Sequence, residues 1–170
     1  LPHACCLVPE RREEITTEGG LDVASNRELL APVIKQLCDK GIRVSLFIDP
    51  EPRQIEAAAQ VVAPVIELHT GKYCNAWLAR DEAAAAGELE RLRNCARLAA
   101  ETGLEVHAGH GLDFDTAWHL AAIPEITELN IGHFLIGEAV FSGLPEVIRR
   151  MRRAIASGVA ARTGRSSRPV

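Results

Sequence analysis

The sequence lacks several patterns that would indicate particular classes of function. No apolar run approaches the roughly 18 residues needed to cross a bilayer, so we expect no membrane partner. Lys and Arg number 19 against 23 Asp and Glu, and this slightly acidic balance gives no reason to expect a nucleic-acid partner. Glycine-rich nucleotide-binding signatures are absent, and no spacing of His, Cys, Asp and Glu is typical of a metal site.

The five cysteines show no Cys-x-x-Cys spacing, and their number is odd. We interpret them as reduced thiols in the core of a cytoplasmic protein, because a disulfide or zinc framework uses recurring spacings. Cys5 and Cys6 are adjacent in a predicted strand and should point to opposite faces of it. The chain begins with Leu1-Pro2, almost directly before that strand, and it lacks the basic stretch with which a signal peptide starts. We therefore expect no signal peptide, and we expect that a segment upstream has been removed or was never sequenced.

Five short apolar runs, each followed by a helical pattern, organise the chain. The predicted strands are 4–8, 43–48, 65–71, 104–108 and 128–131. The predicted helices are 27–40, about 50–62, 76–102, one ending near 123, 135–141 and 144–156. Residues 1–157 are expected to form one domain, and 158–170, rich in Arg, Ser and Gly, a disordered basic tail.

Strict alternation of strand and helix predicts an α/β fold with a parallel sheet. Two architectures fit the 170 residues: an open, doubly wound five-stranded sheet, or the last five units of a (β/α)8 barrel, which needs about 250 residues. The doublet Gly132-His133 after the last strand, followed by a short helix, favours the barrel. In that fold the loops after the last two strands and a short extra helix often bind phosphate.

The most informative stretch is Gly103 to Asp115, where a strand runs directly into His110 between Gly109 and Gly111. A helix follows, with Asp113 or Asp115 as its N-cap. A titratable group at the carboxyl end of a parallel strand indicates a substrate site. The alternative is a tight turn in which His110 is incidental.

Glu67 lies inside an apolar strand, on the same face as His69. A carboxylate there costs several kcal/mol unless it is paired or hydrogen-bonded, so it is either functional or part of an internal salt bridge. His133 could offer backbone and ring N–H groups to a phosphate, whereas His3, His107 and His119 are interpreted as structural. Asp49 and Thr70 are further polar groups at strand ends.

Six motifs occur in one order and together resemble the pyridoxine 5′-phosphate synthase (PdxJ) family. They are Cys-Cys-Leu-Val-Pro-Glu (5–10), Thr-Thr-Glu-Gly-Gly-Leu-Asp-Val (16–23), Val-Ser-Leu-Phe-Ile-Asp (44–49), Ile-Glu-Leu-His-Thr-Gly (66–71), Ala-Gly-His-Gly-Leu (108–112) and Glu-Leu-Asn-Ile-Gly-His (128–133). The resemblance extends to about Ala156. It implies a (β/α)8 TIM barrel in which the present strands are the fourth to the eighth.

The resemblance also implies the activity and the residues that carry it. The family condenses 1-deoxy-D-xylulose 5-phosphate with 3-amino-2-oxopropyl phosphate to pyridoxine 5′-phosphate, phosphate and water, without metal or organic cofactor. His110 matches the proton donor and Glu67 a buried carboxylate that stabilises the transition state. Substrate contacts match Thr16, for the deoxyxylulose phosphate, and Gly111, Gly132 and His133, for the other phosphate. The resemblance implies a homo-oligomer, an octamer in the family.

The chain departs from the family pattern in one respect. Nothing in it matches the first three β/α units, which carry a second catalytic histidine, a catalytic glutamate and phosphate-binding arginines. Two alternatives to the synthase therefore stay open: a non-catalytic scaffold chain of the same fold, and another phosphate-binding barrel enzyme.

Overall fold

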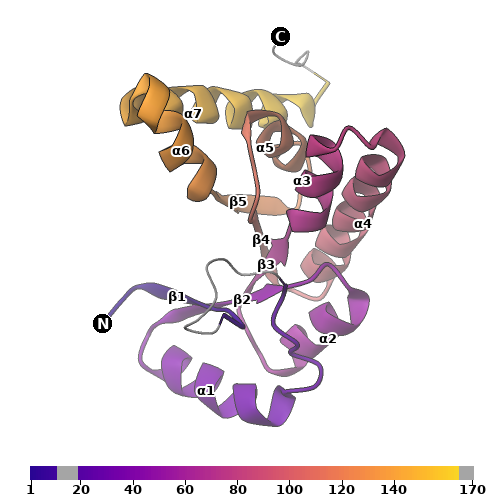
Figure 1. The fold of residues 1–170 in the computed structure, drawn as a ribbon. Coiled ribbons are helices and arrows are strands. Elements are labelled where there is room, and N and C mark those ends of the chain that lie inside the picture. The colour runs from indigo at the N-terminus through magenta and orange to yellow at the C-terminus, as the bar shows by residue number, and fades with distance from the viewer. Residues whose placement is uncertain (11–18, 165–170) are drawn as a thin grey trace. The chain divides into compact units, whose positions relative to one another are not determined.

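The computed structural model describes residues 1–10 and 19–164 and confirms an α/β fold with a five-stranded parallel sheet (Figure 1). Its strands pair in chain order and are β1 (Ala4–Leu7), β2 (Arg43–Ile48), β3 (Val65–His69), β4 (Glu105–Gly109) and β5 (Ile126–Asn130). The helices of the described residues are α1 (Arg27–Asp39), α2 (Pro52–Gln60), α3 (Gly71–Leu78), α4 (Glu82–Glu101), α5 (Phe114–Ala121), α6 (His133–Ser142) and α7 (Leu144–Ala161).

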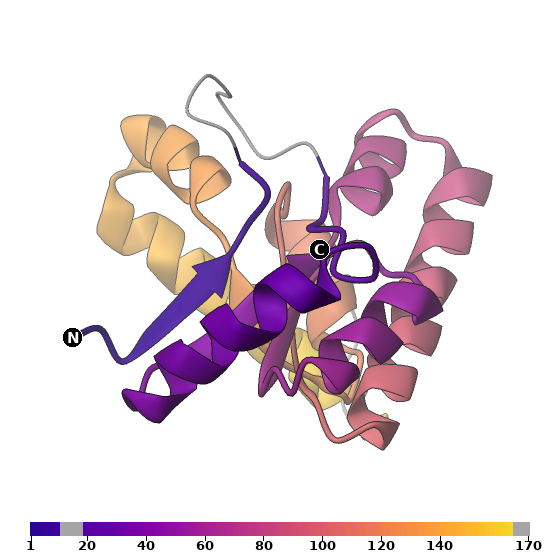
Figure 2. The ribbon, with the colours of Figure 1, turned by 90° about the horizontal axis from the view of Figure 1, so that it is seen from below.

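The described residues group into two compact units. The first contains Leu1–His69 and Arg91–His107, and the second contains Thr70–Glu90 and Ala108 onward. In the first unit, α1 and α2 cover one side of the sheet formed by β1, β2 and β3 (Figures 1 and 2).

The two faces of this sheet differ in chemistry because side chains alternate along each strand. One face is apolar, and its most deeply buried members are Val44, Leu46, Ile48, Ile66 and Leu68. The opposite face is polar: the parallel register pairs Cys6 with Ser45, and Phe47 with Glu67. The polar face therefore brings together titratable side chains of different strands, such as Cys6 of β1 and Glu67 of β3.

The single long helix predicted over 76–102 is wrong, because two helices, α3 and α4, occupy this region. Arg80 between them adopts a left-handed backbone conformation, with φ of 57°, which ends α3. Asp81 then caps the next helix, since its Oδ1 accepts a hydrogen bond from the Ala84 N–H at 3.0 Å. Gly87 lies inside α4.

In the second unit, α5 begins at an N-cap that the sequence had left open between two aspartates. Asp113 is that cap: its Oδ1 accepts a hydrogen bond from the Thr116 N–H at 2.8 Å, and the Thr116 hydroxyl accepts one from the Asp113 N–H at 2.8 Å. Helix α7 packs closely on α5 at Gly158. A Cβ atom there would lie 2.4 Å from the carbonyl oxygen of Trp118, so only glycine allows this approach.

The predicted disordered tail starts too early. Helix α7 continues to Ala161, and the guanidinium of Arg162 donates to the backbone carbonyls of Ala121 at 2.8 Å and Ile126 at 3.0 Å. These bonds tie the end of α7 to the last residue of α5 and the first residue of β5. Residues 165–170, the remainder of the predicted tail, lie outside the described part of the chain.

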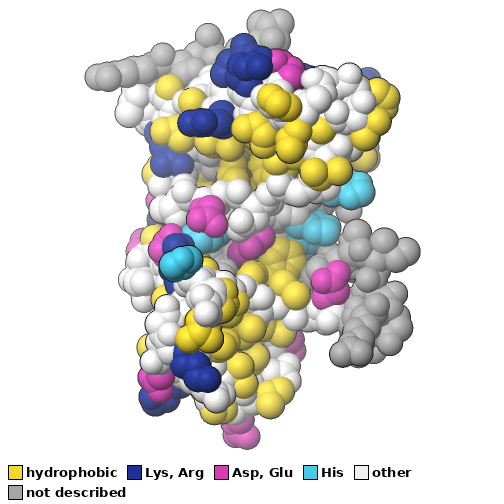
Figure 3. Space-filling model, turned by 90° about the vertical axis from the view of Figure 1, so that its left-hand side faces the viewer, with side chains coloured by type: hydrophobic (Ala, Val, Ile, Leu, Met, Phe, Trp, Pro, Cys, Tyr) yellow, Lys and Arg dark blue, Asp and Glu magenta, His cyan; other side chains and the backbone are white. Residues whose placement is uncertain are grey.

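Helix α6 buries none of its side chains. Ile136, Val140 and Phe141 are 63%, 79% and 87% exposed. The upper part of Figure 3 shows hydrophobic side chains gathered over this helix and α7. An exposed apolar surface of this kind is typical of an interaction site.

No helix in residues 1–10 and 19–164 is long and apolar enough to cross a membrane. All five cysteines are free thiols. The prediction that they lie in the core is right only for Cys74 and Cys95, since Cys5 and Cys38 are half-buried and Cys6 is exposed.

Candidate functional site

Glu67 occupies the middle of β3 on the polar face of the first unit and is only 9% exposed. The thiol of Cys6, on β1, donates a hydrogen bond to Glu67 Oε2 across 3.8 Å. Burial, followed by the negative charge of Glu67, raises the pKa of the Cys6 thiol to about 11. The thiol keeps some solvent contact on the edge strand, yet the protein atoms around its sulfur suffice to disfavour the thiolate.

His69 lies two residues beyond Glu67 on the same face, at the carboxyl end of β3. Its Nδ1 lies 3.1 Å from Oδ1 of Asp49, the residue that directly follows β2. The ring of Phe47 meets the imidazole edge-on, with 5.0 Å between centroids. An Asp–His pair at two neighbouring strand ends can orient the imidazole and bias its proton.

The segment Gly19–Asp22 passes over the end of β2. The Leu21 N–H donates to the carbonyl of Phe47 at 2.7 Å. A Cβ atom on Gly20 would lie 2.1 Å from the Asp49 nitrogen, so this contact requires glycine. Thr16, the predicted contact to the deoxyxylulose phosphate, lies in 11–18, outside the described residues.

His110 follows β4 in the second unit, where it is half-buried. Its φ of 82° is in the left-handed region, which costs a non-glycine residue roughly 1–2 kcal/mol. The hydroxyl of Thr70, a fully buried residue at the start of α3, stabilises this turn, since it lies 2.8 Å from the carbonyl oxygen of Gly109 and 2.5 Å from that of His110. The Thr70 N–H also donates to the Gly109 carbonyl at 3.0 Å. A strained backbone held at a strand end is typical of functional positions.

Gly111 continues the turn with φ of 78°, and its Cα packs against Cys74 of α3. A Cβ atom on Gly111 would lie 3.1 Å from Cys74 Cβ. Burial raises the pKa of the Cys74 thiol to about 11, so this cysteine acts as a packing residue and not as a nucleophile. The close packing fixes the backbone next to His110.

Gly132 and His133 are both exposed, and they stand at the amino end of α6. Gly132 is the N-cap residue, and its carbonyl accepts the first helical hydrogen bond, from the Ile136 N–H at 3.2 Å. The N–H groups of a first helical turn have no partner inside their helix and can bind anions. The second unit thus contains four of the predicted residues, at the end of β4 and the end of β5. Glu67 belongs to the first unit.

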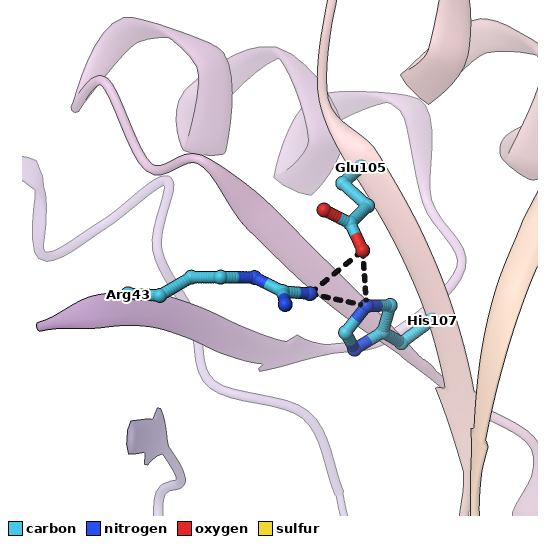
Figure 4. A network of polar contacts seen from close by, with 3 residues as sticks. All are labelled: Arg43, Glu105 and His107. Atoms are coloured by element: carbon cyan, nitrogen blue, oxygen red, sulfur yellow. Dashed lines mark hydrogen bonds and ion pairs between the residues drawn. The ribbon is translucent and has the colours of Figure 1, made fainter. Parts of the chain in front are cut away.

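A second polar cluster lies at the opposite ends of the strands (Figure 4). Arg43 begins β2 and Glu105 begins β4. Arg43 Nη2 lies 2.6 Å from Glu105 Oε1 and 2.9 Å from His107 Nε2, which itself lies 2.9 Å from Glu105 Oε1. Because substrates bind at the carboxyl ends of parallel strands, we assign this cluster a structural role.

Within the described ranges, no group of three or more His, Cys, Asp or Glu side chains is arranged to hold a metal ion. The arrangement instead offers imidazoles and a carboxylate for proton transfer, and backbone N–H groups for anions. Sequence reasoning missed the contacts of Cys6 and Thr70. Alternation of side chains shows which residues of β1 and of β3 share a face. Only the register of the strands shows that Cys6 lies on the same face as Glu67.

Comparison with known proteins supports one family. The family model described as "Pyridoxal phosphate biosynthesis protein PdxJ" matches residues 1–157. A pyridoxine 5′-phosphate synthase of Xanthobacter autotrophicus is 61% identical over 160 residues, covering 94% of this chain and 62% of the relative. Those of a Bradyrhizobium species and of Caulobacter vibrioides are 58% and 60% identical, covering 96% and 89% of this chain and 64% and 59% of the relatives. The chain therefore spans about three fifths of the length of these relatives.

Proposed function

The chain belongs to the family of the pyridoxal phosphate biosynthesis protein PdxJ, and on this premise we propose that it carries part of the active site of a pyridoxine 5′-phosphate synthase. The reaction joins 1-deoxy-D-xylulose 5-phosphate and 3-amino-2-oxopropyl phosphate, and it releases phosphate and water. The observation that carries the proposal is the identity of 58–61% to enzymes of this name over nearly the whole chain. That level of identity favours the synthase over a scaffold chain or another barrel enzyme.

In this proposal His110 is the proton donor and Glu67 stabilises the transition state. Condensing an amine with a ketone, eliminating water and closing an aromatic ring all require proton transfers, and an imidazole can donate and accept protons. The left-handed turn supports this role, since Thr70 holds the His110 backbone by a bond of 2.5 Å. The near-complete burial of Glu67 strengthens its electrostatic effect, because solvent screening is reduced.

Phosphate binding is assigned to Gly111, Gly132 and His133, together with Thr16 from outside the described residues. The exposed first turn of α6 supports the assignment of Gly132 and His133, because its N–H groups and the helix dipole favour an anion. The left-handed glycine at 111 exposes the backbone beside His110. The site is proposed to work without a metal or organic cofactor.

We further propose that residues 1–157 are the fourth to eighth units of a (β/α)8 barrel. The parallel sheet in chain order and the coverage of about three fifths of each relative support this proposal. The family model ends at residue 157, which supports that boundary, although α7 runs on to Ala161. Codons upstream of Leu1 that continue in frame with three further β/α units would agree with it. A stop codon there would contradict it.

The exposed apolar face of α6 supports the proposal that the chain forms a homo-oligomer. From the family we propose an octamer that acts in the cytoplasm on small phosphorylated substrates. Light scattering of the purified protein tests this assembly. Replacing exposed Val140 and Phe141 by Ser should lower the measured mass if α6 lies in an interface. An unchanged mass would place the interface elsewhere.

The function is tested by supplying both substrates and measuring pyridoxine 5′-phosphate by chromatography and phosphate release. We would assay the chain alone and a chimera in which the unmatched part of the Xanthobacter relative precedes it. The chimera should be active, and His110→Asn and Glu67→Gln should each lower kcat by about 100-fold or more. Lys35→Ala, at an exposed i,i+4 ion pair of α1, is the control.

Two outcomes would overturn these proposals separately. A chimera that melts cooperatively but makes no product would contradict the synthase activity. A 170-residue monomer that is well folded and fully active would contradict the partial barrel.

A further inference from the structure

Cys6 is brought to Glu67 by the register of three parallel strands. Cys6 pairs with Ser45 across β1 and β2, and Phe47, two residues further along β2, pairs with Glu67. Paired residues of a parallel sheet share a face, so the thiol and the carboxylate point to the same side. The Sγ–Oε2 distance of 3.8 Å is within the range of a hydrogen bond donated by sulfur.

The chemistry of the thiol makes it a donor. A pKa of about 11, raised first by burial and then by the charge of Glu67, keeps the thiol protonated at neutral pH. A protonated thiol can donate its hydrogen to a carboxylate but is a poor nucleophile.

We propose that Cys6 is a positioning residue for Glu67, holding Oε2 of the carboxylate in the orientation in which it faces the reacting groups. The inference rests on the proposed function, because the role of Glu67 in catalysis belongs to that proposal. A carboxylate on a flexible side chain stabilises charge best when its orientation is fixed before the reaction. Cys6 itself does not touch the substrate in this scheme.

The contact is tested first without any assay of activity. Iodoacetamide is reacted with the folded chain between pH 7 and pH 10, and the alkylation of Cys5 and Cys6 is followed by mass spectrometry. Cys6 should react more slowly than Cys5, and Glu67→Gln should accelerate Cys6 by about tenfold for each pKa unit regained. The rate of Cys5, on the opposite face of β1, should stay unchanged and is the internal control.

The contact would be refuted if Glu67→Gln, folded by circular dichroism, left the rate of Cys6 unchanged. If that variant does not fold, Glu67→Asp takes its place. Its shorter side chain withdraws the carboxylate from the thiol, so the rate of Cys6 should again rise, and an unchanged rate would again refute the contact.

The positioning role is tested by kinetics in the protein that shows synthase activity. Cys6→Ala should lower kcat several-fold with little change in KM, and should move the acid limb of the pH profile upward, because a carboxylate that loses a donor binds a proton more readily. Cys6→Ser should restore most of kcat, and Cys5→Ala should behave as the parent protein. A Cys6→Ala variant with the parent kcat and pH profile would overturn the role.

The two tests separate the inference from the proposed function. If no preparation shows synthase activity, the proposed function fails and the positioning role fails with it. The alkylation rates still show whether the contact between Cys6 and Glu67 exists. With activity present and Cys6→Ala unchanged, only the positioning role fails.

Discussion

The hydroxyl of Thr70 lies 2.5 Å from the carbonyl oxygen of His110, so a buried side chain at the start of α3 holds the backbone of the predicted proton donor. The same hydroxyl lies 2.8 Å from the carbonyl of Gly109. The single hydroxyl proton is shared between these two carbonyl oxygens, and the Gly109 carbonyl also accepts the Thr70 N–H at 3.0 Å. The relationship ties the geometry of the strand end after β4 to the strand end after β3.

Removing that hydroxyl should be costly. Thr70→Val keeps the shape of the side chain but removes the hydroxyl that donates to the His110 carbonyl oxygen, and we expect a loss of about 1–3 kcal/mol in the free energy of unfolding. Thr70→Ser keeps the hydroxyl and should lose less. Urea denaturation of the three proteins measures the difference. Equal stability of Thr70→Val and the parent protein would contradict the structural role of the hydroxyl.

The left-handed backbone at His110 predicts an inverted order of stability for two small substitutions. His110→Gly should be more stable than His110→Ala by about 1 kcal/mol, because only the alanine keeps the steric cost of φ at 82°. His133, in the first turn of α6, is the control: there alanine should be at least as stable as glycine. The melting temperatures of the four variants measure the order of stability at each position. The same order at both positions would refute the left-handed turn.

Asp22 predicts a dependence of stability on pH. Its carboxylate accepts hydrogen bonds from Gln54 Nε2 at 2.8 Å and from the Ser25 N–H at 3.1 Å, and these bonds, with that of Gln54 first, lower its pKa below the ordinary value of 3.8. A lowered pKa in the folded state stabilises the protein at pH above that value, and this contribution is lost as the pH falls through the folded pKa.

We therefore expect Asp22→Asn to lose less stability than the parent protein when the pH is lowered from 7 to 3. Denaturant titrations at both pH values measure this difference. Gln54→Met, which removes the main donor, should act in the same direction. A pH dependence unchanged in both variants would show that the hydrogen bonds to Asp22 are not formed in solution.

The end of α7 predicts where the chain can be shortened. Arg162→Ala removes donors to the carbonyls of Ala121 and Ile126 and should lower the free energy of unfolding by about 1–3 kcal/mol. Arg152→Ala, at an exposed position of the same helix, should have little effect. Truncation after Gly164 should keep the parent melting temperature, whereas truncation after Ser157 should lower it. Equal melting temperatures for both truncations would contradict the packing of this segment.

Local patterns in the sequence predicted most elements but missed the break between α3 and α4 and the true end of α7. The predicted strand 43–48 has the bounds of β2, since a run of apolar residues between Gly41 and Pro50 leaves little freedom for its ends. The break between α3 and α4 was missed because its only local signal is Asp81 as an N-cap. The left-handed conformation of Arg80 is not encoded by its residue type.

The sequence by itself determined the α/β class, the order of strands and helices and the family, because periodicity, glycines and six ordered motifs are properties of the linear chain. It also placed His110 at the end of a strand and Glu67 inside one. Only the tertiary structure decided their neighbours: Cys6 and Glu67, 61 positions apart, meet because of the parallel register, and Thr70 reaches His110 because β3 and β4 lie side by side in the sheet. Such contacts depend on how strands align, and residue types alone do not fix that alignment.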